Sequence, residues 1–429
     1  MFGFLGGTQA LRDRDPARGS TANYGLQDQR EALRFVARNI ASLGGDPARV
    51  FIFGQSAGAG SVAVHLVTRR SWPYFARAGI ESGSMGNWVA QSWASSQHNF
   101  KAVARYTGCA DANSTEASEL ACLLRANTSA LVWAATVQIE VPCRDGCRWA
   151  PTVDGVELTD YPWRMLRNGT VAPHADVLHG SCRDDGFWFQ NSSNSFSIWP
   201  GTDTCTTPRW NATCAFSHWA ATMYGADRVA SLLELYPPES FQRFCTGYNY
   251  SKYPWLKASC LAGKAAGRAE SDFAFTCPAE RTSRALHAAA GRAATGAGVF
   301  EYVFAHLAKN QRHSGDNVDH TFELPYVWGN TRGINDGRPS EASAKLERAL
   351  NAYWVNFAAN GDPNVGVGEG KMPHWPEDDG GGGGRIMWLD SHEHAKDAFH
   401  RKRCAFWDDA WETTFDRCLP QWSGDDSKK

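Results

Sequence analysis

The sequence predicts an α/β protein with a mostly parallel central sheet and helices on both of its faces. Short, almost wholly apolar segments alternate along the chain with segments of helical periodicity. Near-continuous apolar strands are typical of a parallel sheet that is buried on both faces. The composition agrees, because 43% apolar and 21% charged residues in a chain of 429 describe a globular protein.

The first elements follow each other in the order that such a sheet requires. Residues 26–40 place apolar side chains on one helical face with charges opposite, which predicts a helix. Gly44, Gly45 and Pro47 break this helix before an apolar strand at residues 50–53. We expect a second helix at residues 58–67 and, after it, a short strand at residues 78–80.

Two further strands are expected at residues 175–181 and 298–306. The intervening region 187–275 is rich in Cys and in short helical patterns, and we interpret it as a cap on the sheet within a single domain, 1–429. Residues 341–364 predict a long amphipathic helix that ends at Gly361, and the glycines at 380–384 predict a flexible surface loop.

The net charge, the hydropathy and the cysteine content of the chain limit which partners and which cellular location we expect. A net charge of −2 gives no reason to expect nucleic acid, and no apolar run approaches the roughly 20 residues of a membrane span. Twelve Cys together with N-glycosylation sequons favour a secreted, extracellular protein or the ER lumen, although residues 1–5 do not form a signal peptide. The sequons are at Asn113, Asn127, Asn168, Asn191, Asn211 and Asn249.

No metal site and no cofactor are expected. Cys143 and Cys147 have no second ligand pair at metal-binding spacing near them. The other two groups considered also lack the spacing of a metal site; they are His392 with His394, and His313 with Asp316 and Asp319.

A serine stands between two glycines where the strand at 50–53 runs into the next helix, in Gly54-Gln55-Ser56-Ala57-Gly58. A sharp turn of this kind holds the Ser56 hydroxyl above the sheet edge, as a catalytic nucleophile requires. The alternative is an ordinary strand-to-helix turn, because the motif also occurs by chance.

A nucleophilic serine needs a base to accept its proton and an acid to orient that base. In α/β-hydrolases the acid and then the histidine follow the serine along the chain. Asp184 and Asp185 follow the strand at 175–181, and His320 comes later, after the strand at 298–306. The alternatives are a solvated loop carboxylate and a core histidine.

Seven blocks in this order resemble the type-B carboxylesterase and cholinesterase family, which has the α/β-hydrolase fold. Residues 23–66 resemble its nucleophile block, with Leu43 where the family usually has Phe, and "VDHTFELPYVWG" resembles its histidine block. The other similar segments are "ESGSMGNW", "GCADANSTEASELACLLR", "WAPTVDGVELTDYP" with "VLHGSCRDDG", "YWVNFAANGDPN", "HWP" and "CAFW".

The resemblance implies a role for each motif residue. Ser56 is the nucleophile, His320 the general base and Asp185 the orienting acid, since the family's acid directly precedes the glycine. That acid is usually Glu, so Asp is a departure. The N–H of Ala57 belongs to the oxyanion hole, and Ser82 resembles a serine that lies near the triad.

The resemblance also implies two disulfides, Cys109 with Cys122 and Cys277 with Cys404. Other pairs are plausible only because they are close in sequence: Cys143 with Cys147, Cys205 with Cys214, and Cys245 with Cys260. Cys182 and Cys418 are left without an assigned partner.

Residues 1–5 resemble the family just after one of its central strands, so we expect that the N-terminal strands are missing. The loop that supplies further oxyanion N–H groups would be missing with them, which would impair activity. The predicted function is hydrolysis of a small-molecule carboxylic ester through an acyl-enzyme. The alternatives are a non-catalytic adhesion or binding protein and an inactive fragment; the ester and the oligomeric state stay open.

Overall fold

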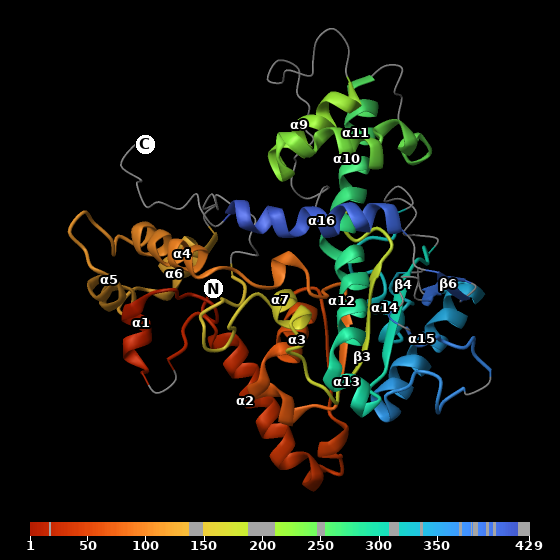
Figure 1. The fold of residues 1–429 in the computed structure, drawn as a ribbon, viewed down its shortest axis with the longest axis horizontal. Helices are drawn as coiled ribbons and strands as arrows, with labels where there is room; N and C mark the ends of the chain where they lie inside the picture. The colour runs from red at the N-terminus through yellow and green to blue at the C-terminus, as the bar shows by residue number, and fades with distance from the viewer. Residues whose placement is uncertain are drawn as a thin grey trace.

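A six-stranded sheet forms the centre of the protein in the computed structural model (Figure 1). The structure describes residues 1–16, 19–136, 149–187, 211–246, 254–308, 317–334, 338–368, 371–378, 380, 385–391, 394–397 and 400–418. The strands are β1 (Phe51–Gln55), β2 (Arg77–Glu81), β3 (Asp176–Cys182), β4 (Val299–Phe304), β5 (Arg385–Leu389) and β6 (His394–Asp397). They lie in the sheet in chain order.

Strands β1 to β5 are parallel, and β6 pairs antiparallel with β5. The carboxyl ends of β1 to β5 therefore meet at one edge of the sheet, where ligands bind in open α/β sheets. Within the described residues, β1 is paired on one side only, with β2.

Helices cover both faces of the sheet, as the apolar strands predicted. On one face α3 packs against β1 and β2, and α12 packs against β3 and β4. On the other face α15 buries Tyr353, Trp354 and Phe357 against Phe300 and Tyr302 of β4. Side chains of a strand alternate between the two faces of the sheet. Val299 therefore lies in the core on the α3 side, and Phe300 lies in the core on the α15 side.

The helices have the following bounds: α1 (Gln9–Arg14), α2 (Tyr24–Asn39), α3 (Ala57–Val67), α4 (Trp93–Tyr106), α5 (Glu116–Leu123), α6 (Thr128–Thr136), α7 (Pro162–Arg167), α9 (Ala212–Tyr224), α10 (Val229–Leu235), α11 (Pro254–Ser271), α12 (Cys277–Ala288), α13 (Ala290–Thr295), α14 (Leu324–Val327), α15 (Glu341–Asn360) and α16 (Arg401–Cys418). Among the described residues, none of the helices is both long and apolar enough to cross a membrane.

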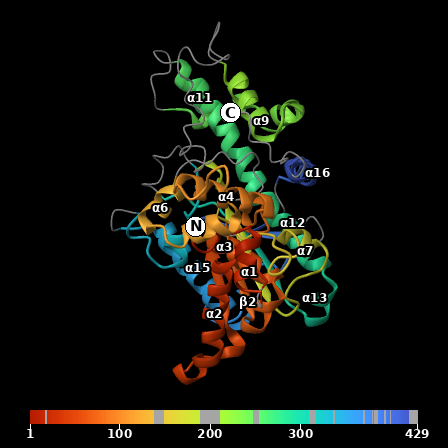
Figure 2. The ribbon, with the colours of Figure 1, turned by 90° about the vertical axis from the view of Figure 1, so that its left-hand side faces the viewer.

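Helices α9 to α11 extend from the end of the molecule at which the parallel strands finish (Figures 1 and 2). Helix α11 continues through a π-helical turn, Asp272–Thr276, directly into α12, so this group is tied to the layer that covers the sheet. The description of region 187–275 as a cap stays a prediction, and its residues 188–210 and 247–253 lie outside the described residues.

The structure confirms the predicted α/β fold and places four of its strands where the apolar segments predicted them. Helix α15 ends at Gly361, whose φ of 77° is the left-handed conformation that favours glycine at such an end. Strands β5 and β6 were not predicted. Residues 381–384 of the glycine run lie outside the described residues.

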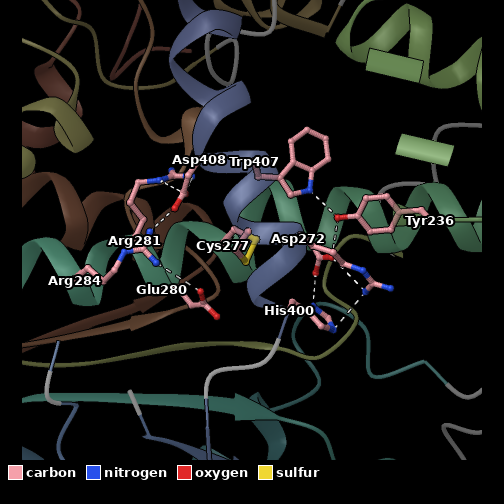
Figure 3. The surroundings of a disulfide bond; sticks show 11 residues. Tyr236, Asp272, Cys277, Glu280, Arg281, Arg284, His400, Trp407 and Asp408 are labelled. Atoms are coloured by element: carbon pink, nitrogen blue, oxygen red, sulfur yellow. Dashed lines mark hydrogen bonds and ion pairs between the residues drawn. A yellow bond between two sulfur atoms is a disulfide. The ribbon is translucent and has the colours of Figure 1, made fainter. Parts of the chain in front are cut away.

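Three disulfides join described residues. Cys109–Cys122 and Cys245–Cys260 each close a short loop, and Cys277–Cys404 links α12 to α16. Figure 3 shows the last of these beside a layer of buried polar side chains. Cys182 is a free, buried thiol, and Cys214 is disulfide-bonded. The predicted partners Cys143, Cys147 and Cys205, and the unassigned Cys418, have no described side chain.

Candidate active site

Ser56 occupies a sharp turn between β1 and α3. Its φ of 57° and ψ of −122° are unusual for a residue with a side chain, which indicates local backbone strain. The turn is fixed on both sides, because the Ser56 N–H donates to the carbonyl of Glu81 and the Gly60 N–H donates to the carbonyl of Ser56. Gly54 is required, since a Cβ there would lie 2.5 Å from the carbonyl carbon of Gly58.

The turn faces a cavity of about 550 Å³. Ser56 and Ala57 line it from α3, and Trp88, Phe273 and Phe275 contribute much of its apolar wall. Further lining residues include Phe4, Val89, Trp149 and Pro151, and Glu270 is the one charged side chain among the described residues that line it. The cavity therefore suits an apolar or aromatic group near the serine.

Asp185 and His320 come together, although they are far apart in the sequence. The Nδ1–H of His320 donates to Oδ1 of Asp185 at 2.7 Å, and the backbone N–H of Cys182 donates to Oδ2 at 2.8 Å. The Asp185 side chain is fully buried, and His320 is 5% exposed. This arrangement fixes the imidazole with a hydrogen on Nδ1 and its Nε2 as an acceptor.

The neighbouring Asp184 has a different environment. It forms ion pairs with Arg183 and Arg268 and accepts a hydrogen bond from the backbone N–H of Val318. Burial by itself would raise the pKa of Asp184, but the two guanidinium groups outweigh burial and hold it below its usual value. Asp184 is thus an ion-pair partner, and Asp185 is the carboxylate at the histidine.

The other ring nitrogen of His320 lies against Gln55. The side-chain nitrogen of Gln55 is 3.2 Å from Nε2 of His320, which suits donation from the amide to that nitrogen. Within the described part of the chain, no hydrogen bond joins the Ser56 hydroxyl to His320. Catalytic hydrogen bonds often form only when substrate is bound. The contact of His320 with Gln55, the residue before Ser56, therefore does not conflict with a role of His320 as the base.

The environment of His320 favours its protonated form. Burial lowers the pKa of the ring, but the hydrogen bond and the negative charge of Asp185 outweigh burial, so the pKa lies above the ordinary value. The aromatic ring of Phe275 packs at 5.2 Å from the imidazole ring and limits its movement.

Two further buried acids, Glu323 and Glu81, lie close to the Asp185 and His320 pair. Burial, with the nearby Asp185 carboxylate, raises the pKa of Glu323 to about 7, and the Cys182 thiol donates to Oε2 of Glu323. Burial, with the charge of Glu323, raises the pKa of Glu81 to about 8, although the indole N–H of Trp354 donates to this carboxyl. The sequence pattern gave no signal for this group.

The remaining predicted site residues lie near the turn. Ala57 begins α3, where the first N–H groups of a helix have no partner within the helix. Ser82 is fully buried with a φ of 55°, and within the described residues its hydroxyl has no hydrogen-bond partner.

Four of the predicted sequons lie in the part of the chain that the structure describes. Asn113, Asn127, Asn168 and Asn211 are exposed. Asn191 and Asn249 lie outside the described residues, as do His313, Asp316 and His392. In the described part of the chain, no three His, Cys, Asp or Glu side chains are grouped so that they could hold a metal ion.

Comparison with known proteins decides the family. The model of a family described as "Carboxylesterase family" matches residues 2–407. The chain belongs to the carboxylesterase family. This result confirms the resemblance seen in the motif blocks and agrees with the parallel sheet and the serine turn of the structure.

The curated relatives include enzymes by name and one protein named as a neuroligin. The chain is 28% identical to "Cholinesterase" of Mus musculus over 82% of its own length, and 27% identical to "Acetylcholinesterase 1" of Caenorhabditis briggsae over 95%. It is 29% identical to "Neuroligin-2" of Rattus norvegicus over 86%. The matches cover 54%, 63% and 40% of these relatives, so the chain spans about half their length.

Sequence reasoning did not find the contact of Gln55 with His320, nor Phe273, Phe275 and Glu270 in the cavity wall. Gln55 lies within the serine motif, so its place next to Ser56 was the available signal. The other three lie at the end of α11 and in the π-helical turn after it, whose position at the cavity depends on tertiary packing.

Proposed function

We propose that this chain is a serine hydrolase that cleaves carboxylic esters through an acyl-enzyme. The hydrogen bond between Asp185 and His320, whose ring contacts Gln55 next to the strained Ser56 turn, carries the proposal. A histidine held in this tautomer can accept a proton at Nε2, which is what activation of a serine hydroxyl requires. The membership of the chain in the carboxylesterase family supports the same chemistry.

In the proposed reaction, the Ser56 Oγ attacks the ester carbonyl while Nε2 of His320 accepts the hydroxyl proton. The imidazolium is stabilised by Asp185, and the N–H of Ala57 donates to the developing oxyanion. His320 then returns the proton to the leaving alcohol. Water attacks the acyl-enzyme with His320 as base, which releases the carboxylic acid and restores Ser56.

The substrate side of the proposal rests on the cavity wall. Trp88, Phe273 and Phe275 favour an ester with an apolar or aromatic portion, and no cofactor takes part.

For the location, we propose a secreted or ER-lumenal glycoprotein, supported by the three disulfides and the four exposed sequons. Treatment with an N-glycosidase would lower the apparent mass of the protein from a secretory host if the sequons are used.

The decisive experiment measures p-nitrophenyl butyrate hydrolysis and labelling by a fluorophosphonate probe. Ser56→Ala should abolish both. Ser61→Ala is the matched control, because Ser61 lines the same cavity from the same helix and should keep both activities. If the folded wild-type chain neither hydrolyses the ester nor reacts with the probe, the proposal fails and a binding protein on this fold becomes the better interpretation.

A further inference from the structure

A second, larger cavity of about 1300 Å³ lies at the carboxyl ends of β3, β4 and β5. Arg183 follows β3, His306 follows β4, and Asp390 follows β5, and all three line it. It has none of the described lining residues of the Ser56 cavity, so it is a separate site. This edge of a parallel sheet is a common place for ligand binding.

Positive charge predominates among the charged side chains that line the cavity. Four arginines line it, whereas Asp390 is the one carboxylate among the described lining residues. The arginines come from four parts of the chain and are Arg183, Arg243, Arg268 and Arg403. Gathering like charges around one cavity costs free energy unless an anion compensates them.

Two buried carboxylates that do not line the cavity hold two of these guanidinium groups in place. Asp184 forms an ion pair with Arg268, and a side-chain oxygen of Asp272 lies 3.5 Å from a guanidinium nitrogen of Arg403. With these two and Asp390, the arginines still outnumber the carboxylates. A guanidinium carries five N–H donors, so Arg403 and Arg243 retain donors beyond their contacts within the described residues.

The start of α16 is held in place next to the cavity. His400, which lines it, donates from Nδ1 to Asp272 at 2.8 Å, and the Tyr236 hydroxyl donates to the same carboxylate. Trp407 in turn donates to the Tyr236 hydroxyl at 2.7 Å. Figure 3 shows these side chains converging on Asp272 beside the disulfide at Cys277. The disulfide and this network order the position of Arg403 before any ligand binds.

Part of the wall is apolar and aromatic. Phe241, Phe244 and Trp388 line the cavity, and the Arg243 guanidinium lies 4.5 Å above the ring of Phe244. Arginine groups that flank aromatic rings suit a ligand that combines an oxyanion with a flat apolar body.

We propose that this cavity is a binding site for an organic phosphate monoester with an aromatic body. The phosphate dianion binds among Arg243, Arg268 and Arg403, and the ring packs against Phe244 and Trp388. A dianion is favoured over a monoanion because several guanidinium groups are available to it. The site is independent of ester hydrolysis at Ser56.

Isothermal titration calorimetry of the full chain with phenyl phosphate tests the proposal. Wild type and Ser56→Ala should bind it equally, whereas Arg403→Gln and Arg243→Gln should each weaken binding by at least about tenfold. Arg243 is exposed and forms no ion pair with described residues, so its replacement should leave folding intact. Lys402→Gln is the matched control: it removes a positive charge next to Arg403 in α16 from a side chain that does not line the cavity.

Phenol, phenyl sulfate and inorganic phosphate complete the experiment. Phenol should not bind, and phenyl sulfate and inorganic phosphate should each bind more weakly than phenyl phosphate. The proposal is overturned if phenyl phosphate does not bind, if Ser56→Ala abolishes its binding, or if Lys402→Gln weakens it as much as the arginine variants do. Binding of inorganic phosphate as tight as that of phenyl phosphate would refute the aromatic part of the assignment.

Discussion

Replacement of each of the two adjacent aspartates by Asn should separate activity from stability. Asp185→Asn removes the charge that stabilises the imidazolium and allows the amide to reverse the tautomer of His320. Changes of this type in a catalytic triad cost about 10⁴-fold in kcat, or roughly 5 kcal/mol of transition-state stabilisation. The Asn side chain retains the shape and can still accept from the Cys182 N–H, so the folded structure should persist.

Asp184→Asn should have the opposite effect. It leaves the guanidinium groups of Arg183 and Arg268 without their carboxylate, at a position where the Asp184 side chain is 3% and that of Arg268 10% exposed. Breaking a buried pair by removal of one partner costs about 3–5 kcal/mol. Since Arg183 is more exposed, we expect the lower end, about 3 kcal/mol of unfolding free energy, with kcat/KM of the folded protein within about tenfold of wild type.

The assay combines p-nitrophenyl butyrate kinetics between pH 5 and 9 with urea denaturation of each variant. His320 must be neutral to act as the base, so its raised pKa places the rise of kcat/KM above the ordinary histidine range in wild type. Loss of the Asp185 charge lowers the pKa of His320, so the residual activity of Asp185→Asn should rise at lower pH. Loss of activity in folded Asp184→Asn, with full activity in Asp185→Asn, would refute the assignment of the acid.

Three further predictions concern stability. Gly54→Ala should destabilise the protein by several kcal/mol because its Cβ would collide with the backbone of Gly58, whereas Gly58→Ala has open space and should be nearly neutral; guanidinium denaturation compares them. Replacing Cys277 and Cys404 by Ser should cost about 5 kcal/mol, against about 3 for either disulfide that spans 13 or 15 residues, and non-reducing thermal melts that rank them otherwise would contradict this estimate. The pKa of Glu81 is raised to about 8 on folding, so its contribution to stability falls as pH rises from about 4.5 to 8; Glu81→Gln should therefore gain stability relative to wild type at pH 8 compared with pH 5, in urea titrations at both values.

Burial explains the prediction of β2 and β4 best, since β1, which was also predicted, is only partly buried. The segments that became β2 and β4 are buried along their whole length, and apolar runs of this kind have few other interpretations. Strand β6, with the sequence His-Ala-Lys-Asp, escaped prediction because it has no apolar pattern, whereas β5, Arg-Ile-Met-Trp-Leu, has an apolar run that was overlooked. The place of β6 in the sheet comes from antiparallel pairing with β5, which is a main-chain interaction that sequence composition does not record.

The site residues were predictable where a turn requires particular residues, or where the order of hydrolase motifs along the chain limits their position. Ser56 was identified from the glycines that the turn needs, and the positions of Asp184, Asp185 and His320 followed from the order of hydrolase motifs. The residues alone did not distinguish the two aspartates, since both follow the same strand; the family position of the acid made that choice. The contact of Gln55 with His320 depends on the packing of loops that are distant in sequence.

The position of Ser56 at the end of the outermost described strand has a structural consequence. Within the described residues, β1 pairs in the sheet with β2 alone, and Phe53 of β1 is 42% exposed and packs against Trp328. The strain at Ser56 is maintained from the β2 side, where its N–H donates to the carbonyl of Glu81, and from α3, where the Gly60 N–H donates to the carbonyl of Ser56. The Glu81 side chain is anchored in turn by Trp354 of α15. Because a strained turn persists only where its surroundings fix it, the geometry of the proposed nucleophile depends on the packing of α15 and β2 more than on the exposed edge of β1.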